Sequence, residues 1–245
     1  MSKEKIVIVT GASSGIGLAT VKALIHEGYT VVGFARRKGK MISEMESVKG
    51  KERFYPYECD VTKSEKVEGA FKWVKKTFGT VHILVNNAGI VIHKKFMDSS
   101  RADWEKVFAV NTMGYLECSK QAAKIMLDSN VESCIVNINS IEGHMLYYYP
   151  GLDFNVYPST KHASRAATEM MQKDFHGTKI RVTSISPGLV ATNLLNASNP
   201  NMDFSKFSYP ILTPEDIANA VVYVIGTPQH VNVTELIIRP LGEVV

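Results

Sequence analysis

The sequence predicts an α/β fold in which helices cover both faces of one mainly parallel sheet. Short apolar runs of strand length alternate with longer stretches in which apolar residues recur at helical spacing. Two strands joined by a helix form a parallel crossover unit, and no self-similar period typical of a solenoid occurs. The seven strands and about six helices therefore predict a doubly wound, seven-stranded sheet in a single domain over residues 1–245.

The first strand–helix unit is marked by strong signals. An apolar strand at residues 6–9 leads through a glycine-rich turn into a helix at 16–26, which Gly28 ends. The other predicted strands cover residues 30–34, 54–58, 83–85, 134–138, 181–185 and 235–238. The other predicted helices cover residues 40–48, 64–78, 104–127, 158–175 and 214–225. Thr213 as N-cap and Pro214 at the first helical position mark the start of the last helix.

The composition is that of a globular protein with a sizeable core. Of 245 residues, 45% are hydrophobic and 21% are charged, and the mean hydropathy is −0.03, which argues against disorder. The longest apolar runs, such as 6–9 and 221–225, are far shorter than the roughly 18 residues of a membrane span. Because the net charge is only +4 and the basic cluster at 36–40 is short, we expect no nucleic-acid partner.

The cysteines and the first residues predict a cytoplasmic protein. Cys59, Cys118 and Cys134 form no CxxC pair and have no histidine at metal-ligand spacing, so we expect a reducing compartment and no metal site. The charged residues 1–5 run into an apolar segment of four residues, which is too short for the core of an export signal.

The glycine turn between the first strand and the first helix predicts a nucleotide site. Residues 10–17 read TGASSGIG, with glycines spaced as GxxxGxG. Glycines at this position allow the backbone to approach a pyrophosphate, and the N–H groups that open the helix attract its negative charge. Open α/β sheets bind ligands at this place, beyond the carboxyl ends of their strands.

The glycine pattern resembles the fingerprint of the short-chain dehydrogenase/reductase superfamily. Three further motifs of that family follow in order: NNAG at 86–89, YxxxK at 157–161, and PGxxxT, carried by Pro187, Gly188 and Thr192. The resemblance covers residues 5–240. It implies a Rossmann fold and reversible hydride transfer between a nicotinamide and a carbon that bears an alcohol or carbonyl oxygen.

Such a transfer needs a group that exchanges the hydroxyl proton near neutral pH, and Tyr157 is the candidate. A free tyrosine titrates near 10, and Lys161, one turn later on the same helix face, would favour the phenolate. An ordinary solvated pair is the alternative. The resemblance implies that Lys161 also holds the nicotinamide ribose, that Ser140 binds the substrate oxygen and that Asn111 anchors a relay water. Ser140 could instead be a turn residue, and Asn111 a satisfied core amide.

The end of the second strand predicts NADP(H) as cofactor. Ala35 stands where the resemblance would place the ribose-binding acid of an NAD enzyme, and Arg36 and Arg37 follow it. A guanidinium can bind the extra phosphate of NADP through two hydrogen bonds. The resemblance further implies that Asp60 contacts the adenine. The full expected cofactor set is Gly11, Ser13, Ser14, Gly15, Ile16, Gly17, Arg36, Arg37, Asp60, Val61, Asn87, Ala88, Gly89, Tyr157, Lys161, Pro187, Gly188, Val190 and Thr192.

Two loops predict a lipophilic substrate. From Ser140 to Tyr157 is 17 positions, which is longer than is common in the family, and the intervening loop at about 141–156 is apolar and aromatic. A second loop at 193–212 is also rich in aromatic residues and methionine. Together they would line the opening above the nicotinamide and favour an elongated alcohol or carbonyl compound. The aromatic residues could instead pack against each other or in a subunit interface.

Segments 138–140, 143–144, 157–162 and 186–190 resemble the farnesol dehydrogenase-like branch of insects, which has a mammalian relative acting on ketosteroids. This implies oxidation of a farnesol-like isoprenoid alcohol or, alternatively, reduction of ketosteroids or other ketones. A catalytically idle NADP-binding regulator is less favoured because Asn111, Ser140, Tyr157 and Lys161 are all present. The resemblance also implies a homodimer or homotetramer formed through the helices at 104–127 and 158–175.

Overall fold

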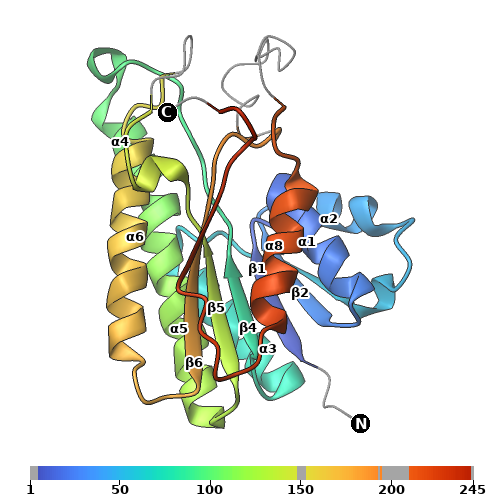
Figure 1. Ribbon diagram of the computed structural model, residues 1–245. Helices are drawn as coiled ribbons and strands as arrows, with labels where there is room; N and C mark the ends of the chain where they lie inside the picture. Colours follow the sequence, from blue (N-terminus) through green and yellow to red (C-terminus); the bar gives the residue numbers. More distant parts are fainter. Residues whose placement is uncertain (1–4, 148–152, 193, 195–209, 244–245) are drawn as a thin grey trace.

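A computed structural model describes residues 5–147, 153–192, 194 and 210–243, and its strands form one sheet (Figure 1). The strand order is β3-β2-β1-β4-β5-β6-β7, and every neighbouring pair is parallel. The strands are β1 (Ile6–Thr10), β2 (Thr30–Ala35), β3 (Phe54–Glu58), β4 (Ile83–Asn86), β5 (Ser133–Ile138), β6 (Ile180–Pro187) and β7 (Glu235–Ile238). The predicted doubly wound, seven-stranded sheet is confirmed.

The helices lie close to their predicted positions. They are α1 (Gly15–His26), α2 (Lys38–Met45), α3 (Ser64–Phe78), α4 (Arg101–Phe108), α5 (Tyr115–Ser129), α6 (Tyr157–Asp174) and α8 (Pro214–Gly226). The predicted start of α8 is confirmed. The Thr213 hydroxyl accepts a hydrogen bond from the Asp216 N–H at 3.3 Å, and the Asp216 carboxylate accepts one from the Thr213 N–H at 2.7 Å.

Alternate residues of the central strands enter two different hydrophobic clusters. In β1, Val7 and Val9 pack with α1, α2 and α8, whereas Ile6 and Ile8 pack with α3, α5 and α6. This alternation is the period of two of an extended chain, and it explains why a continuous apolar run forms a strand buried on both faces. Figure 1 shows α1 and α8 side by side on one face of the sheet and α5 and α6 on the other.

The helix predicted at 104–127 follows one continuous path but changes its winding. The structure has two α-helices, α4 and α5, joined by a π-helical segment at Ala109–Gly114. Helix α4 begins earlier than predicted because Ser100 and Asp103 form a capping box. Within the π-helical segment, a Cβ on Gly114 would lie 2.8 Å from the Val61 carbonyl oxygen. Short π-helical segments often occur at functional sites.

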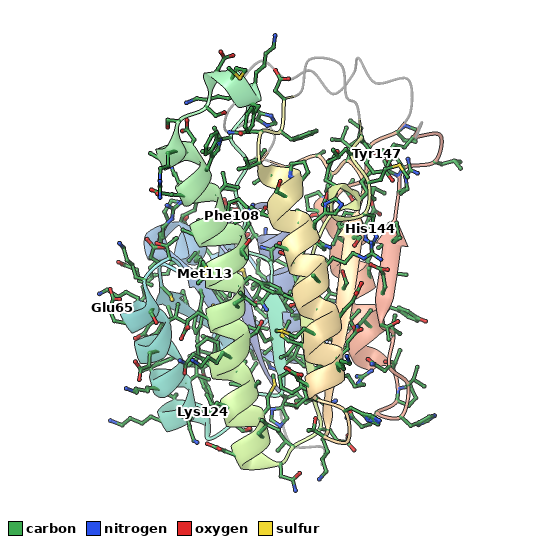
Figure 2. All side chains as sticks on the ribbon, turned by 90° about the vertical axis from the view of Figure 1, so that its left-hand side faces the viewer. Glu65, Phe108, Met113, Lys124, His144 and Tyr147 are labelled. Carbon is green, nitrogen blue, oxygen red and sulfur yellow. The ribbon has the colours of Figure 1, made fainter. Side chains whose placement is uncertain are left out.

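The layer of α5 and α6 carries exposed apolar side chains on its outer surface (Figure 2). Phe108 and Met113 point outward from the continuous α4–α5 path, and Met113 is 62% exposed. Among the described residues, no helix is both long enough and apolar enough to cross a membrane. The loops predicted at 141–156 and 193–212 are described only in part, because residues 148–152, 193 and 195–209 lie outside the described residues.

Candidate functional site

The candidate site lies where the strand order reverses direction, between the carboxyl ends of β1 and β4. A cavity of about 640 Å³ opens there, within the range of about 300–1,000 Å³ that is usual for ligand sites. Most of the predicted cofactor residues line it: Gly11, Ser13, Ser14, Gly15, Ile16, Arg36, Arg37, Asp60, Val61, Asn87, Ala88, Gly89, Tyr157, Lys161 and Thr192.

The glycine turn has a shape that only glycine allows. Gly11 and Gly15 have φ angles of +67° and +54°, in the left-handed region. A Cβ on Gly11 would lie 2.8 Å from the Asn87 side-chain nitrogen and 2.9 Å from the Ala88 Cα. A Cβ on Gly17 would lie 2.4 Å from the Gly11 carbonyl oxygen. Gly17 is absent from the cavity lining, so its contribution is to let α1 begin close against the turn.

The first turn of α1 presents backbone N–H groups to the cavity. Its N-cap residue, Ser14, makes no side-chain capping hydrogen bond, and the turn contains no acidic residue. The partial positive charge of this helix end therefore has no compensating carboxylate within its own first turn. A phosphate or pyrophosphate group fits such a position.

Thr10 holds the glycine turn against the NNAG motif. Its hydroxyl oxygen accepts hydrogen bonds from the N–H groups of Asn87 and Ala88, both at 3.0 Å. The Asn87 side chain donates to the Thr10 carbonyl oxygen at 2.9 Å. Asn86 is buried below the cavity and donates to Ser119 and Asn137. Asn87 therefore lines the cavity while its amide stabilises the turn, and Asn86 joins β4 to its neighbours.

Two arginines and one acid stand at the β2 and β3 end of the cavity. Arg36 and Arg37 are exposed and line it, and Arg37 donates to the Ser13 hydroxyl at 3.3 Å. Burial alone would raise the pKa of Asp60, but hydrogen bonds from Thr62, with the charges of Arg36 and Lys63, hold it below its ordinary value. Asp60 is thus a carboxylate at neutral pH, next to a cationic rim.

Tyr157 and Lys161 meet at the base of the cavity, and both are buried. The Lys161 ammonium lies 5.6 Å from the centre of the Tyr157 ring and donates to the Ile138 carbonyl oxygen at 2.9 Å. The Tyr157 hydroxyl is hydrogen-bonded to the Ser140 side chain. Since neither charged group reaches bulk water, this is not a solvated surface pair.

Burial dominates the ionisation of both groups. It raises the pKa of Tyr157 above its ordinary value, against the hydrogen bond from Ser140 and together with the nearby Glu142 carboxylate. Burial also lowers the pKa of Lys161 to about 8. The expected depression of the pKa of Tyr157 by Lys161 is therefore outweighed in this structure, and the neutral phenol is the favoured form.

Asn111 is bonded entirely within the protein core. Its side-chain oxygen accepts from the Ile90 N–H at 2.8 Å, and its nitrogen donates to the Ile90 carbonyl at 2.9 Å and to Thr160 at 3.1 Å. Among the described residues, the side chain makes no hydrogen bond to Lys161. These contacts are those of a satisfied core amide, and the relay role stays a prediction.

A second cavity of about 80 Å³ adjoins the first, and Tyr157 lines both. Its walls include the remaining predicted residues Ser140, Pro187, Gly188 and Val190, together with the apolar Ile141, Phe154 and Leu189. A small, mostly apolar space next to a proton-exchanging group fits the reacting end of a lipophilic substrate.

Three residues of the site were not predicted. Ile90 and Asn139 line the large cavity, and their positions directly after Gly89 and directly before Ser140 could have indicated it. Asn139 is buried, and neither of its side-chain polar atoms has a hydrogen-bond partner among the described residues. Glu142, an acid within an apolar stretch, lines the second cavity.

The donor set fits a dinucleotide better than a metal ion. The free N–H groups of α1, the glycine cradle and the unpartnered Asn139 amide all supply contacts that a phosphate- and amide-bearing cofactor needs. In the described part of the chain, no group of three or more histidine, cysteine or acidic side chains is placed to hold a metal.

Residues 5–203 match the family model of the short chain dehydrogenases. The chain belongs to the short-chain dehydrogenase family. It is 41% identical over 248 residues to farnesol dehydrogenase of Aedes aegypti, with 98% of this chain and 97% of that protein covered. It is 33% identical over 252 residues to dehydrogenase/reductase SDR family member 11 of Homo sapiens, with 99% and 96% covered.

Among solved structures, the chain is similar to the closed form of a serine dehydrogenase complexed with NADP+. The TM-score is 0.88 at 28% identity, and 98% of this chain and 96% of that chain are covered. The expected Rossmann fold is thereby confirmed, as are membership of the short-chain dehydrogenase family and likeness to the farnesol dehydrogenase branch. The protein is an oxidoreductase of this family.

Proposed function

We propose that this short-chain dehydrogenase is an NADP-dependent enzyme that interconverts a lipophilic alcohol and its carbonyl compound, with Tyr157 as general acid/base. The observation that carries the proposal is the position of Tyr157. Its side chain lines both the dinucleotide-sized cavity and the small apolar cavity, and its hydroxyl is hydrogen-bonded to Ser140. A group placed between two ligand cavities can exchange a proton with the molecule in one while the other holds the hydride carrier.

The bound nicotinamide would supply or accept the hydride, and the protein's residues would manage the proton. In reduction, Tyr157 donates its hydroxyl proton to the carbonyl oxygen while Ser140 donates a hydrogen bond to the same oxygen. In oxidation, Tyr157 takes the hydroxyl proton. Because burial raises the pKa of Tyr157, the acid form prevails at neutral pH, and oxidation should accelerate as the pH rises.

The cofactor residues favour NADP(H) over NAD(H). Ala35 brings no carboxylate to the ribose, and Arg36 and Arg37 line the same rim of the cavity. The similar serine dehydrogenase structure is a complex with NADP+. Arg36→Ala should raise the KM for NADP+ about tenfold or more and leave the KM for NAD+ nearly unchanged, because it removes a charged contact to phosphate. Lys38→Ala, at an exposed neighbour of the rim, is the matched control.

The substrate we favour is a farnesol-like isoprenoid alcohol. The relative from Aedes aegypti is named farnesol dehydrogenase, and the described walls of the small cavity are mainly aliphatic and aromatic. NADPH-dependent reduction of ketosteroids or other bulky ketones is the alternative. An idle NADP-binding regulator on the same fold is disfavoured by the geometry of Ser140, Tyr157 and Lys161.

The test is the absorbance change at the nicotinamide when the purified protein meets farnesol with NADP+ and, separately, with NAD+. NADP+-dependent turnover that Tyr157→Phe abolishes, while NADPH binding persists, supports the proposal. Retained turnover in Tyr157→Phe would overturn the mechanism. No turnover of farnesol would move the assay to ketosteroids and bulky ketones with NADPH, and failure there as well would favour the regulator.

We also propose that the protein acts in the cytoplasm as one NADP-binding domain per chain, assembled as a homodimer or homotetramer. The exposed apolar side chains on the α4–α5 and α6 layer support the assembly, because Met113 and Met170 are 62% and 49% exposed and such patches often mark interfaces.

A further inference from the structure

Glu142 is a buried acid in the small cavity, and the proposed chemistry gives it no role. It is only 3% exposed and lies in the turn directly after Ser140, where its N–H donates to the Ser140 hydroxyl oxygen at 3.1 Å. Among the described residues that line the small cavity, Glu142 is the only one with a charged side chain. The other walls are apolar or carry neutral polar groups.

The Glu142 carboxylate has little compensation from the protein. Among the described residues, one hydrogen bond reaches it, from the Tyr147 N–H at 3.3 Å, and no basic side chain forms an ion pair with it. The neighbouring Glu243 differs, because its carboxylate accepts hydrogen bonds from Arg239 at 2.8 Å and from the Leu189 N–H at 3.1 Å. A buried carboxyl without a cation is costly to ionise.

The ionisation of Glu142 agrees with this geometry. Burial raises its pKa to about 7, against the Tyr147 hydrogen bond and with a further increase from Glu243. The same carboxylate raises the pKa of Tyr157, so it stands close to the reacting hydroxyl. A carboxyl that is poorly satisfied, reachable from a ligand cavity and near the acid/base group is in a position to bind a polar group of the substrate.

We propose that Glu142 is a specificity-determining residue that binds a hydrogen-bond-donating group, an ammonium or a hydroxyl, carried by the substrate close to its carbinol carbon. An ammonium supplies the missing cation, and a hydroxyl supplies the missing donor. A carboxylate at the same place would meet a like charge and is rejected. A cavity of about 80 Å³ that holds both Glu142 and Ser140 leaves room for only a short spacing between the two substrate groups. This inference rests on the proposed oxidoreductase function.

Four alcohols with one carbon skeleton test the inference. They are 1-phenylethanol and its three derivatives in which the methyl group carries a hydroxyl, an amine or a carboxylate: 1-phenyl-1,2-ethanediol, 2-amino-1-phenylethanol and 3-hydroxy-3-phenylpropanoate. Oxidation by the unmodified protein with NADP+ at neutral pH should give the amino alcohol a kcat/KM about tenfold above that of 1-phenylethanol. The diol should lie between them, and the hydroxy acid about tenfold below the parent.

Glu142→Gln should compress this ranking. The amino alcohol should lose its advantage and the hydroxy acid its penalty, while 1-phenylethanol changes little. Glu169→Gln is the matched control, because Glu169 is exposed on α6 and paired with Arg165, and it should keep the original ranking. An unchanged ranking in Glu142→Gln would overturn the inference.

The ranking by the unmodified protein is a second test that does not depend on whether the variant folds. If 1-phenylethanol is oxidised as well as the amino alcohol and the diol, Glu142 does not select for a donor group, and the inference fails. The inference also fails if farnesol or a ketone is turned over and none of the donor-bearing alcohols is oxidised. If no alcohol or ketone of any kind is turned over, the proposed function itself fails, which is a distinct result.

Discussion

Replacing Glu142 by glutamine should change how the stability of the folded protein depends on pH. Burial raises the pKa of Glu142 from an ordinary value of 4.5 to about 7, so between these values the folded state binds more protons than the unfolded chain. The stability of the unmodified protein should therefore fall as the pH rises from 4.5 to 7. The full loss should be present above pH 7 and absent below pH 4.5.

The size of the effect follows from the same two values. At about 1.4 kcal/mol for each tenfold change in the proton equilibrium, ionised Glu142 destabilises the folded state by up to about 3 kcal/mol. Glutamine is nearly isosteric and can still accept the hydrogen bond from the Tyr147 N–H. Glu142→Gln should thus be more stable than the unmodified protein by about 3 kcal/mol at pH 8, with almost no difference at pH 4.

Urea unfolding at pH 4, 6 and 8 measures this directly, because the midpoint and slope give the free energy at each pH. Glu169→Gln, at an exposed ion pair on α6, should differ from the unmodified protein by no more than about 0.5 kcal/mol throughout. Parallel stability curves for Glu142→Gln and the unmodified protein would show that the carboxyl is solvated in the folded state. The reasoning on its burial, and with it the substrate preference, would then be wrong.

Three further predictions concern the core, the glycine turn and the assembly. Asn111→Ala leaves the buried Ile90 N–H and carbonyl without partners and should destabilise the fold by about 2–4 kcal/mol in urea unfolding; lost turnover at unchanged stability would instead favour the relay role. Gly17→Ala, whose Cβ would lie 2.4 Å from a backbone oxygen, should weaken NADPH binding in fluorescence titration at least tenfold, whereas Gly39→Ala, with nothing within 4 Å, should not; equal affinities would contradict the close packing. Met113→Glu should shift the mass measured by light scattering toward the 27.1 kDa monomer, and an unchanged oligomer would place the interface elsewhere.

Local patterns were sufficient to predict the elements of the fold. The strand β1 is a short apolar run because alternate residues are buried on opposite faces of the sheet, and the capping box at Thr213 marks the start of α8 within a few residues of sequence. The π-helical winding at Ala109–Gly114 could not be predicted in this way. It coincides with Asn111 bonding to Ile90 and with Gly114 packing against Val61, which are contacts between distant parts of the chain.

The candidate site shows the same division. Motifs with fixed spacing placed Tyr157, Lys161 and the glycine turn in one cavity, because each motif follows a strand whose carboxyl end faces that cavity. Their ionisation was another matter. Spacing alone suggested that Lys161 lowers the pKa of Tyr157, whereas the depth of burial of both groups raises it.

The sequence by itself determined the alternation of strands and helices, the nucleotide turn, the family and the positions of the proton-exchanging residues. These features depend on residue type and spacing along the chain, which are local properties. The tertiary structure alone decided that Asn111 is a satisfied core amide, that Asn139 and Glu142 face ligand cavities, and that Glu142 lacks a cation. Burial and charge compensation depend on which distant segments pack together, and one-dimensional spacing carries no such information.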